Sequence, residues 1–233
     1  MRHRQRLSIV FLTLCLLLTA CNGNPLETVP GTDSASSGTT LPAPTPGADT
    51  QPRRFIIQEG ALQVTYSVHE ELFDQELTSR TTVGGTSQVE GEMVLQIDPR
   101  SGGVAVGENQ MTVNLESLTS NEERRDNRIR REWLESTTYP LATFVTTEIQ
   151  GFPAGIQEGE EVPFQLVGDL TIRDMAQSTT FTTTAVLNGD TISGTATTLI
   201  YMRDFGFEPP NVMGILAVTD GVTVTLRFVM KEE

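Results

Sequence analysis

The sequence predicts an all-β domain, an antiparallel barrel or sandwich of about eight strands with one short helix between strands. From residue 55 onward, apolar and polar residues alternate with a period of two, as in strands with one buried face. Threonine and valine are abundant, which half-buried strands favour. No β-α-β rhythm is present, so a parallel sheet is not expected.

The chain begins with a segment that we expect to be a cleaved signal peptide. Arg2, Arg4 and Arg6 precede an apolar run over residues 7–18, which is too short to span a bilayer comfortably. The run is followed by Thr-Ala-Cys, and this order resembles a bacterial lipobox. The resemblance implies cleavage before Cys21 and a lipid on its sulfur, and therefore an extracytoplasmic protein anchored to a bacterial membrane. The alternative is an ordinary cleaved signal in which Cys21 is incidental.

A proline-rich stretch separates this segment from the first strand. Residues 22–52 contain six prolines and four glycines and very few apolar residues. Such a stretch cannot bury enough surface to offset the entropy of ordering, so we predict a disordered tether. The expected organisation is a signal peptide over residues 1–20, a lipidated N-terminus and tether over residues 21–54, and a folded domain over residues 55–233.

Charge and residue content narrow the classes of function. The net charge is −14, and because residues 1–20 carry three arginines and no acidic residue, their removal gives −17. The mature chain would keep one cysteine, Cys21, and one histidine, His69, so neither a cysteine–histidine pair nor a histidine-rich zinc site can form. Neither a Gly-x-Ser-x-Gly elbow nor a phosphate-binding glycine loop is present. We expect no enzyme, no metal site and no cofactor.

The predicted strands follow one another at hairpin-like spacing. The alternation is clearest in residues 62–69, 93–97, 111–115, 181–187 and 222–228. Asn188-Gly189 is expected to form the centre of a type I′ hairpin turn, where both central residues need positive φ. The side chains expected to face inward are Val64, Tyr66, Val68, Met111, Val113, Phe144, Phe164 and Leu166. An inward position is consistent with a packed core and equally with a ligand-binding wall.

The stretch over residues 120–135 breaks the alternation and predicts the helix. Ser120 followed by Glu123 fits a capping box, and Ile129 and Trp133 lie four residues apart on one face. Five of the fifteen arginines lie in this helix, where three pairs of opposite charge at a spacing of four are expected to neutralise most of them. These pairs are Asp126–Arg130, Arg128–Glu132 and Arg131–Glu135. The domain is acidic and the helix holds one aromatic residue, so nucleic-acid binding is not expected.

The helix and the residues around it resemble the signature of the YceI-like, polyisoprenoid-binding family. The matching residues are Ser117, Leu118, Thr119, Arg125, Asp126, Trp133, Leu134, Tyr139, Pro140 and Phe144. Downstream, Gly168 begins a stretch similar to the family's glycine-x-leucine-threonine strand. Arg203-Asp204-Phe205-Gly206 is similar to its arginine-x-aspartate-phenylalanine-glycine element, shortened by one residue. Glu70 stands where many members have a histidine. We interpret the motif residues, including Asp204 and Gly206, as determinants of the fold.

The resemblance implies an eight-stranded, lipocalin-like antiparallel barrel that binds a long apolar ligand, such as an isoprenoid quinone or another polyisoprenoid lipid. One five-carbon unit would contribute roughly 3–4 kcal/mol on burial, so a few units exceed the cost of association. The acidic surface disfavours an anionic head, so we expect a neutral, quinone-like head over a polyprenyl phosphate. The alternative is a ligand-free surface lipoprotein that docks to a cell-envelope partner. A hollow barrel favours the carrier, and a filled interior favours the docking module.

Overall fold

The computed structural model describes residues 51–58, 60, 62–73, 79–98, 102–105, 107, 109–213 and 215–233. The predictions for Cys21, for the signal peptide and for almost all of the tether lie outside the described residues. Within the described part of the chain, no helix is both long enough and apolar enough to cross a membrane. The first strand begins at Arg53, two residues before the predicted start of the domain.

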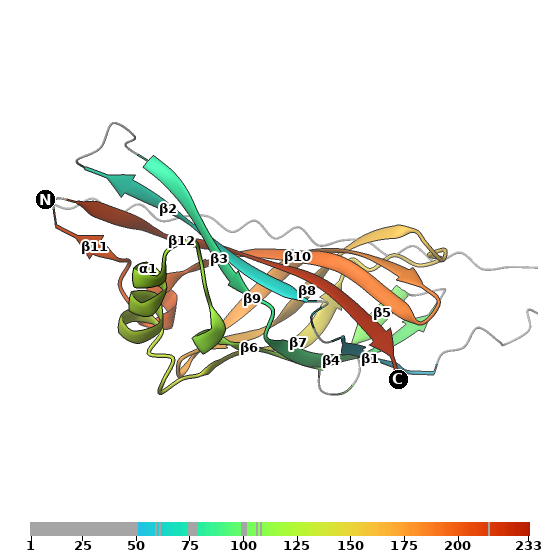
Figure 1. Cartoon of the computed structure of the whole chain (residues 1–233). Helices are drawn as coiled ribbons and strands as arrows, with labels where there is room; N and C mark the ends of the chain where they lie inside the picture. Colours follow the sequence, from blue (N-terminus) through green and yellow to red (C-terminus); the bar gives the residue numbers. More distant parts are fainter. Residues whose placement is uncertain are drawn as a thin grey trace, which may run out of the picture. The chain divides into compact units, whose positions relative to one another are not determined.

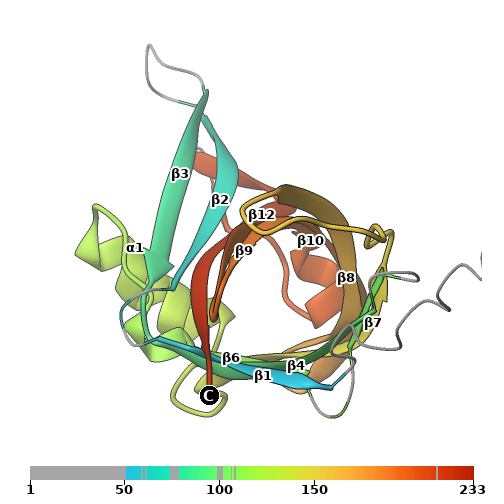
Figure 2. The same ribbon diagram turned by 90° about the vertical axis from the view of Figure 1, so that its right-hand side faces the viewer.

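The described strands form one antiparallel sheet that closes into a barrel (Figures 1 and 2). The strands are β1 (Arg53–Ile57), β2 (Gln63–Leu72), β3 (Ser79–Thr86), β4 (Val89–Asp98), β5 (Gly102–Ala105), β6 (Asn109–Asn114), β7 (Leu141–Gln150), β8 (Glu161–Ile172), β9 (Met175–Asn188), β10 (Thr191–Tyr201), β11 (Asn211–Val212) and β12 (Leu216–Glu232). The helical segments are the 3₁₀ turns η1 (Leu115–Ser117) and η3 (Met202–Phe205), the helix α1 (Glu123–Arg128) and its π-helical continuation η2 (Ile129–Trp133).

Eight strand positions make up the closed ring, which confirms the predicted barrel with one short helix. β1 and β2 both pair with β12, so together they occupy one position of the ring. On their other side β1 pairs with β4 and β2 with β3, so β3 and β4 together occupy the second position. β5 and β6 both pair with β4 and form the third position. β7, β8, β9, β10 and β12 complete the ring, in which every pairing is antiparallel.

The turn between β9 and β10 differs from the predicted one. Asn188 pairs directly with Thr191, so the central residues of the turn are Gly189 and Asp190, and the prediction of Asn188-Gly189 was wrong. Gly189 has a φ of 58°, whereas Asp190 is not among the residues with positive φ. Glycine at the first central position with ordinary φ at the second fits a type II′ turn, whose twist also suits a hairpin.

One end of the barrel is filled by side chains. Here β1 lies against the last residues of β12, and the carboxylate of Glu233 accepts a hydrogen bond from Arg54 at 2.6 Å. The fully buried or nearly buried apolar side chains at this end are Phe55, Leu62, Met93, Ile192 and Met230. The residual space among the side chains at this end is about 40 Å³. This half of the barrel is therefore a conventional hydrophobic core.

Gly168 allows a close approach between β8 and β7. A Cβ at this position would lie 2.2 Å from the carbonyl oxygen of Val145 and 2.9 Å from the Cα of Thr146, beside a bulge in β7. Since backbone atoms cannot rotate away as a side chain can, we expect Gly168→Ala to lower the free energy of unfolding by about 2–3 kcal/mol. Chemical denaturation measures the change. Gly221→Ala is the control, because its Cβ first meets the flexible Cδ1 of Leu199 at 3.3 Å; an equal loss in both variants would contradict the explanation.

Candidate functional site

The opposite end of the barrel holds a cavity of about 210 Å³ that is partly open to solvent. Its wall is built from inward-facing side chains of β2, β6 to β10 and β12, together with one face of the helix. The lining residues that remain half-buried, such as Ile129, Trp133, Pro210 and Val218, lie near the helix and the start of β12. The opening therefore lies at this end of the barrel, and the packed core closes the other end.

Small side chains in the wall leave this half of the barrel hollow, and large ones close its floor. The wall includes two buried alanines, Ala142 and Ala196, where a larger side chain would reach the axis. The floor is formed by Phe144 and Phe181, whose rings meet edge to face with their centroids 4.9 Å apart, and by Leu166. Leu166 lines both this cavity and the small one at the packed end. The interior is thus a cavity with a floor, and not a continuous tunnel through the barrel.

The volume bounds what the cavity accommodates in this conformation. An apolar cavity of about 150 Å³ holds one benzene molecule, so 210 Å³ accommodates about eight or nine non-hydrogen atoms. This is between one and two isoprene units. A longer chain must extend through the opening, or the rings of Phe144 and Phe181 must move apart to admit it.

Seven of the eight side chains expected to face inward line this cavity. They are Val64, Tyr66, Val68, Met111, Val113, Phe144 and Leu166. Phe164 instead borders the small cavity at the packed end, where its ring centroid lies 5.2 Å from that of Phe152. The alternation correctly assigns the face of β8 that carries Phe164. It contains no information on the position along the barrel axis, and Phe164 lies in the packed core and not in the wall of the larger cavity.

The helix supplies part of the wall that the strands do not. Ile129, Trp133 and Leu134 line the cavity together with Arg125. The shared face of Ile129 and Trp133 is as predicted. Arg125 and Trp133 were expected to serve the fold alone, yet both border the cavity. The edge of β3 reaches the segment before the helix through Gly85, whose backbone exchanges hydrogen bonds of 2.8 and 3.0 Å with Thr119.

The start of the helix is held by Asp126 and not by the predicted capping box. The N-cap is Glu122, which makes no capping bond with its side chain. Ser120 instead donates both its hydroxyl and its backbone N–H, the latter at 2.7 Å, to the buried carboxylate of Asp126. Asp126 is therefore engaged by Ser120 and forms no ion pair with Arg130, contrary to the prediction. Arg130 donates to the carbonyl of Leu118 at 2.8 Å, which ties the helix to the preceding segment.

The end of the helix is fixed by a contact with the β8–β9 turn. Glu135 forms an ion pair with Arg173, so the predicted pair with Arg131 is wrong, while the predicted Arg128–Glu132 pair is present at 3.3 Å. Glu135 and Arg173 both adopt positive φ, of 48° and 59°. The ion pair thus joins two residues that both adopt this uncommon conformation in turns. The connection orients the helix against the barrel.

The remaining motif residues shape the chain around the cavity. The guanidinium of Arg173 lies over the ring of Tyr139, 5.8 Å from its centroid, and the carbonyl of Pro140 accepts the N–H of Leu115 at 2.8 Å. Gly206 has a φ of 75° and ends η3, so its positive φ, and not a close approach, requires glycine. The side chain of Asp204 is exposed, and the backbone carbonyl of this residue accepts a hydrogen bond from the side-chain amide of Gln177 at 2.6 Å.

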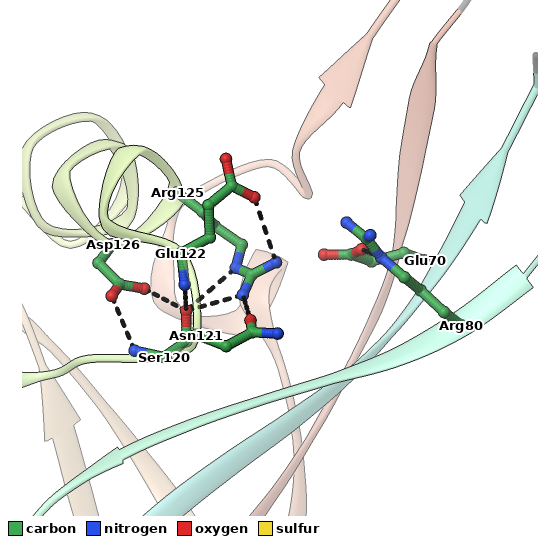
Figure 3. A network of polar contacts seen from close by, with 7 residues as sticks. All are labelled: Glu70, Arg80, Ser120, Asn121, Glu122, Arg125 and Asp126. Atoms are coloured by element: carbon green, nitrogen blue, oxygen red, sulfur yellow. Dashed lines mark hydrogen bonds and ion pairs between the residues drawn. The ribbon is translucent and has the colours of Figure 1, made fainter.

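Polar groups gather where the helix faces the cavity (Figure 3). Arg125 donates to the hydroxyl of Ser120 at 2.7 Å and to the side-chain oxygen of Asn121. Glu70, which is 2% exposed, forms an ion pair with Arg80 on the neighbouring strand β3. In Figure 3 the residues around Arg125 lie at the helix, and the Glu70–Arg80 pair lies opposite them on the strands. Glu70 and Arg125 are the two charged residues that line the cavity wall among the described residues.

Tyr66 lies beside these groups and has a strongly raised pKa. Burial of the phenol raises the pKa to about 12, the carboxylates of Asp126 and Glu70 act in the same direction, and Arg125 opposes them. Because the folded-state pKa exceeds the unfolded value, the stability linked to Tyr66 is present below pH 10 and is lost as the pH rises from about 10 to 12. We expect Tyr66→Phe to remove this part of the alkaline loss of stability. Denaturation at pH 9 and pH 11.5 tests this, and an unchanged pH dependence in Tyr66→Phe would contradict it.

The described residues contain no group of three His, Cys, Asp or Glu side chains that could hold a metal ion. His69 is exposed on the outer face of β2, and its backbone carbonyl accepts a hydrogen bond from the hydroxyl of Thr219 at 3.3 Å. The cavity wall contains no histidine and no cysteine within the described part of the chain. The polar residues in the cavity wall include Tyr66, Glu70 and Arg125.

Comparisons with known proteins agree with this architecture. The sequence profile of the YceI-like domain matches residues 61–230. The structure resembles Burkholderia cenocepacia BcnA (TM-score 0.55, 24% identity, covering 74% of this chain and 98% of that one). It also resembles a polyisoprenoid binding domain from Saccharophagus degradans implicated in plant cell wall breakdown (0.57, 15%, 77% and 98%) and the Campylobacter jejuni YCEI protein (0.51, 16%, 68% and 89%). A search of curated proteins gave no significant match. At these identities the structural likeness shows the fold alone.

Proposed function

Since this chain belongs to the YceI-like domain family, we propose that it binds or carries a long apolar ligand, such as an isoprenoid quinone or another polyisoprenoid lipid. The observation that carries the proposal is the apolar cavity of about 210 Å³ between the helix and the floor formed by Phe144 and Phe181. The name of the Saccharophagus degradans domain, which refers to polyisoprenoid binding, supports the same class of ligand. We propose binding, and no catalysis, as the function of this cavity.

The energetics indicate how much of a chain must be buried. Eight buried carbons contribute roughly 6 kcal/mol, at about 0.8 kcal/mol for each CH₂. This lies at the lower end of the 4–15 kcal/mol that association costs. Tight binding therefore requires further burial, through movement of the floor or through contacts between the helix and the part of the chain near the opening.

The charges near the cavity support an uncharged head. Glu70 is paired with Arg80 and Arg125 with Glu122, and Asp126 adds a further carboxylate, so the polar groups drawn in Figure 3 hold no excess of positive charge for a phosphate. The net charge of −14 disfavours an anion at longer range as well. We therefore propose that the protein prefers a ligand with a neutral head, such as a quinone or an alcohol, to a polyprenyl phosphate.

The proposal extends to the location of the protein. The lipobox-like order before Cys21, together with the proline-rich stretch after it, supports a lipid-anchored, extracytoplasmic domain on a tether. A carrier anchored near a bilayer can exchange an apolar ligand with the membrane without diffusing away. Mass spectrometry of the N-terminal peptide tests this part, because a peptide that starts at unmodified Cys21 or earlier would contradict it.

The ligand is tested by native mass spectrometry of the full chain purified from the membranes of its own organism. We expect a co-purified lipid whose mass corresponds to a quinone or another uncharged polyisoprenoid. A bound polyprenyl phosphate without quinone would reverse the choice of head and leave the apolar-chain proposal intact. Protein that carries no lipid, and that binds no added polyprenyl chain, would instead favour the ligand-free module that docks to an envelope partner.

A further inference from the structure

Glu70 occupies an unusual position for a carboxylate. Its side chain is 2% exposed and lines the cavity on the same face of β2 as Tyr66 and Val68. The ion pair with Arg80 uses Oε2, and Oε1 accepts no hydrogen bond from any residue in the described part of the chain. A buried carboxylate with a single partner is unfavourable for stability unless its remaining acceptor sites are used.

The charged groups near the cavity other than Glu70 already have partners. Arg125 donates to Ser120 and Asn121, and its guanidinium lies 3.8 Å from the carboxylate of Glu122. The carboxylate of Asp126 accepts both bonds from Ser120. Oε1 of Glu70 is thus the carboxylate oxygen that the cavity presents without a hydrogen-bond donor among the described residues.

We infer that Glu70 selects the head of the ligand, and that it selects a head with a hydroxyl group, as in an alcohol or a hydroquinone. An ionised carboxylate only accepts hydrogen bonds, so it binds a hydroxyl and repels the lone pairs of an ether or a carbonyl oxygen. This inference rests on the proposed function, because it concerns the same cavity. It adds that the protein distinguishes a hydroquinone from the corresponding quinone, and a polyprenyl alcohol from its ether.

Arg80 pairs with the carboxylate without closing the site. Its side chain is 40% exposed and approaches Glu70 from the neighbouring strand, at a directly paired position. Arg80 itself does not line the cavity wall. The guanidinium therefore balances the charge of Glu70 from the solvent side and leaves the cavity side of the carboxylate to the ligand.

The test compares a 20-carbon polyprenyl alcohol with its methyl ether, using the fluorescence of Trp133, which is the single tryptophan of the chain and lines the cavity. We expect the wild-type protein to bind the alcohol about tenfold more tightly, or about 1.4 kcal/mol, because a hydrogen bond to a charged acceptor is lost in the ether. Glu70→Gln should reduce this preference below about threefold, since an amide donates to the ether as well as accepting from the alcohol.

Two matched variants separate this role from a structural one. Glu71→Gln changes the exposed neighbour of Glu70 and should retain the full preference. Arg80→Gln removes the ion-pair partner of Glu70 but keeps its carboxylate, so this variant should also retain the preference for the alcohol. It therefore tests the role of the carboxylate independently of how well Glu70→Gln folds. Equal, saturable binding of alcohol and ether by the wild-type protein would overturn the inference and leave the proposed function standing. Binding of neither compound would overturn both.

Discussion

Ala196→Phe is expected to weaken binding of a polyprenyl chain by at least about a hundredfold while the barrel still forms. Ala196 is 2% exposed, lies in the middle of β10 and lines the cavity. A benzene molecule occupies a cavity of about 150 Å³, so a phenyl ring at this position fills most of the 210 Å³. The loss corresponds to about 2.7 kcal/mol, or three to four CH₂ groups that can no longer be buried.

A titration followed by Trp133 fluorescence measures this loss, and circular dichroism confirms that the strands are retained. The control is Ala176→Phe, which makes the same change at an exposed position of β9 and should bind as the wild type does. Ala142→Leu, in the wall on β7, provides a second variant if the phenylalanine disturbs folding. Unchanged affinity in folded Ala196→Phe would mean that the chain binds elsewhere on the protein.

Phe181→Ala is expected to lower the free energy of unfolding by about 3–5 kcal/mol. The side chain is 3% exposed, and its ring packs edge to face against Phe144 with a centroid separation of 4.9 Å. The loss includes the transfer of the ring out of the core, the cavity that remains, and about 0.5–1.5 kcal/mol for the aromatic pair. Chemical denaturation without ligand measures it.

The same variant should change the preferred length of the ligand. Removal of the ring opens the floor toward the small cavity beyond Leu166, so a 20-carbon chain should gain affinity relative to a 10-carbon chain. Phe55→Ala is the matched control, because this fully buried ring lies in the packed half and its loss should destabilise the barrel without altering the length preference. A destabilised Phe181→Ala with an unchanged length preference would show that the floor does not limit the chain.

The alternation of apolar and polar residues was sufficient to predict an antiparallel barrel or sandwich and the inward face of most strands, and the family resemblance indicated the barrel. Val64, Tyr66 and Val68 lie in the cavity wall because a period of two assigns a side of the sheet directly. The same alternation continues to Glu70 and places an acidic residue inward, a signal that could have identified this site before the structure. Phe164 faces inward as expected but lies at the packed end, because its depth along the axis depends on the stagger of neighbouring strands, which residue periodicity does not contain.

The helix shows where local patterns fail. The capping box and two of the three predicted charge pairs were replaced by partners outside the local spacing: Ser120 bonds to Asp126, and Arg173 pairs with Glu135 across 38 residues. Pairs at a spacing of four contribute only about 0.2–0.5 kcal/mol, so a better-placed tertiary partner displaces them readily. The predictions for Cys21, the signal peptide and the membrane anchor concern residues outside the described part of the chain and remain predictions.

Photo-crosslinking with a polyprenyl alcohol that carries a diazirine at the end of its tail tests the central claim most directly, because it identifies the residues that touch the buried chain. If the cavity binds the chain, the tail should label the floor, at Phe144, Leu166 or Phe181, and an excess of unlabelled alcohol should prevent the labelling. Labelling confined to outward-facing residues such as Leu199, or labelling that the unlabelled alcohol does not reduce, would contradict a ligand bound inside the barrel.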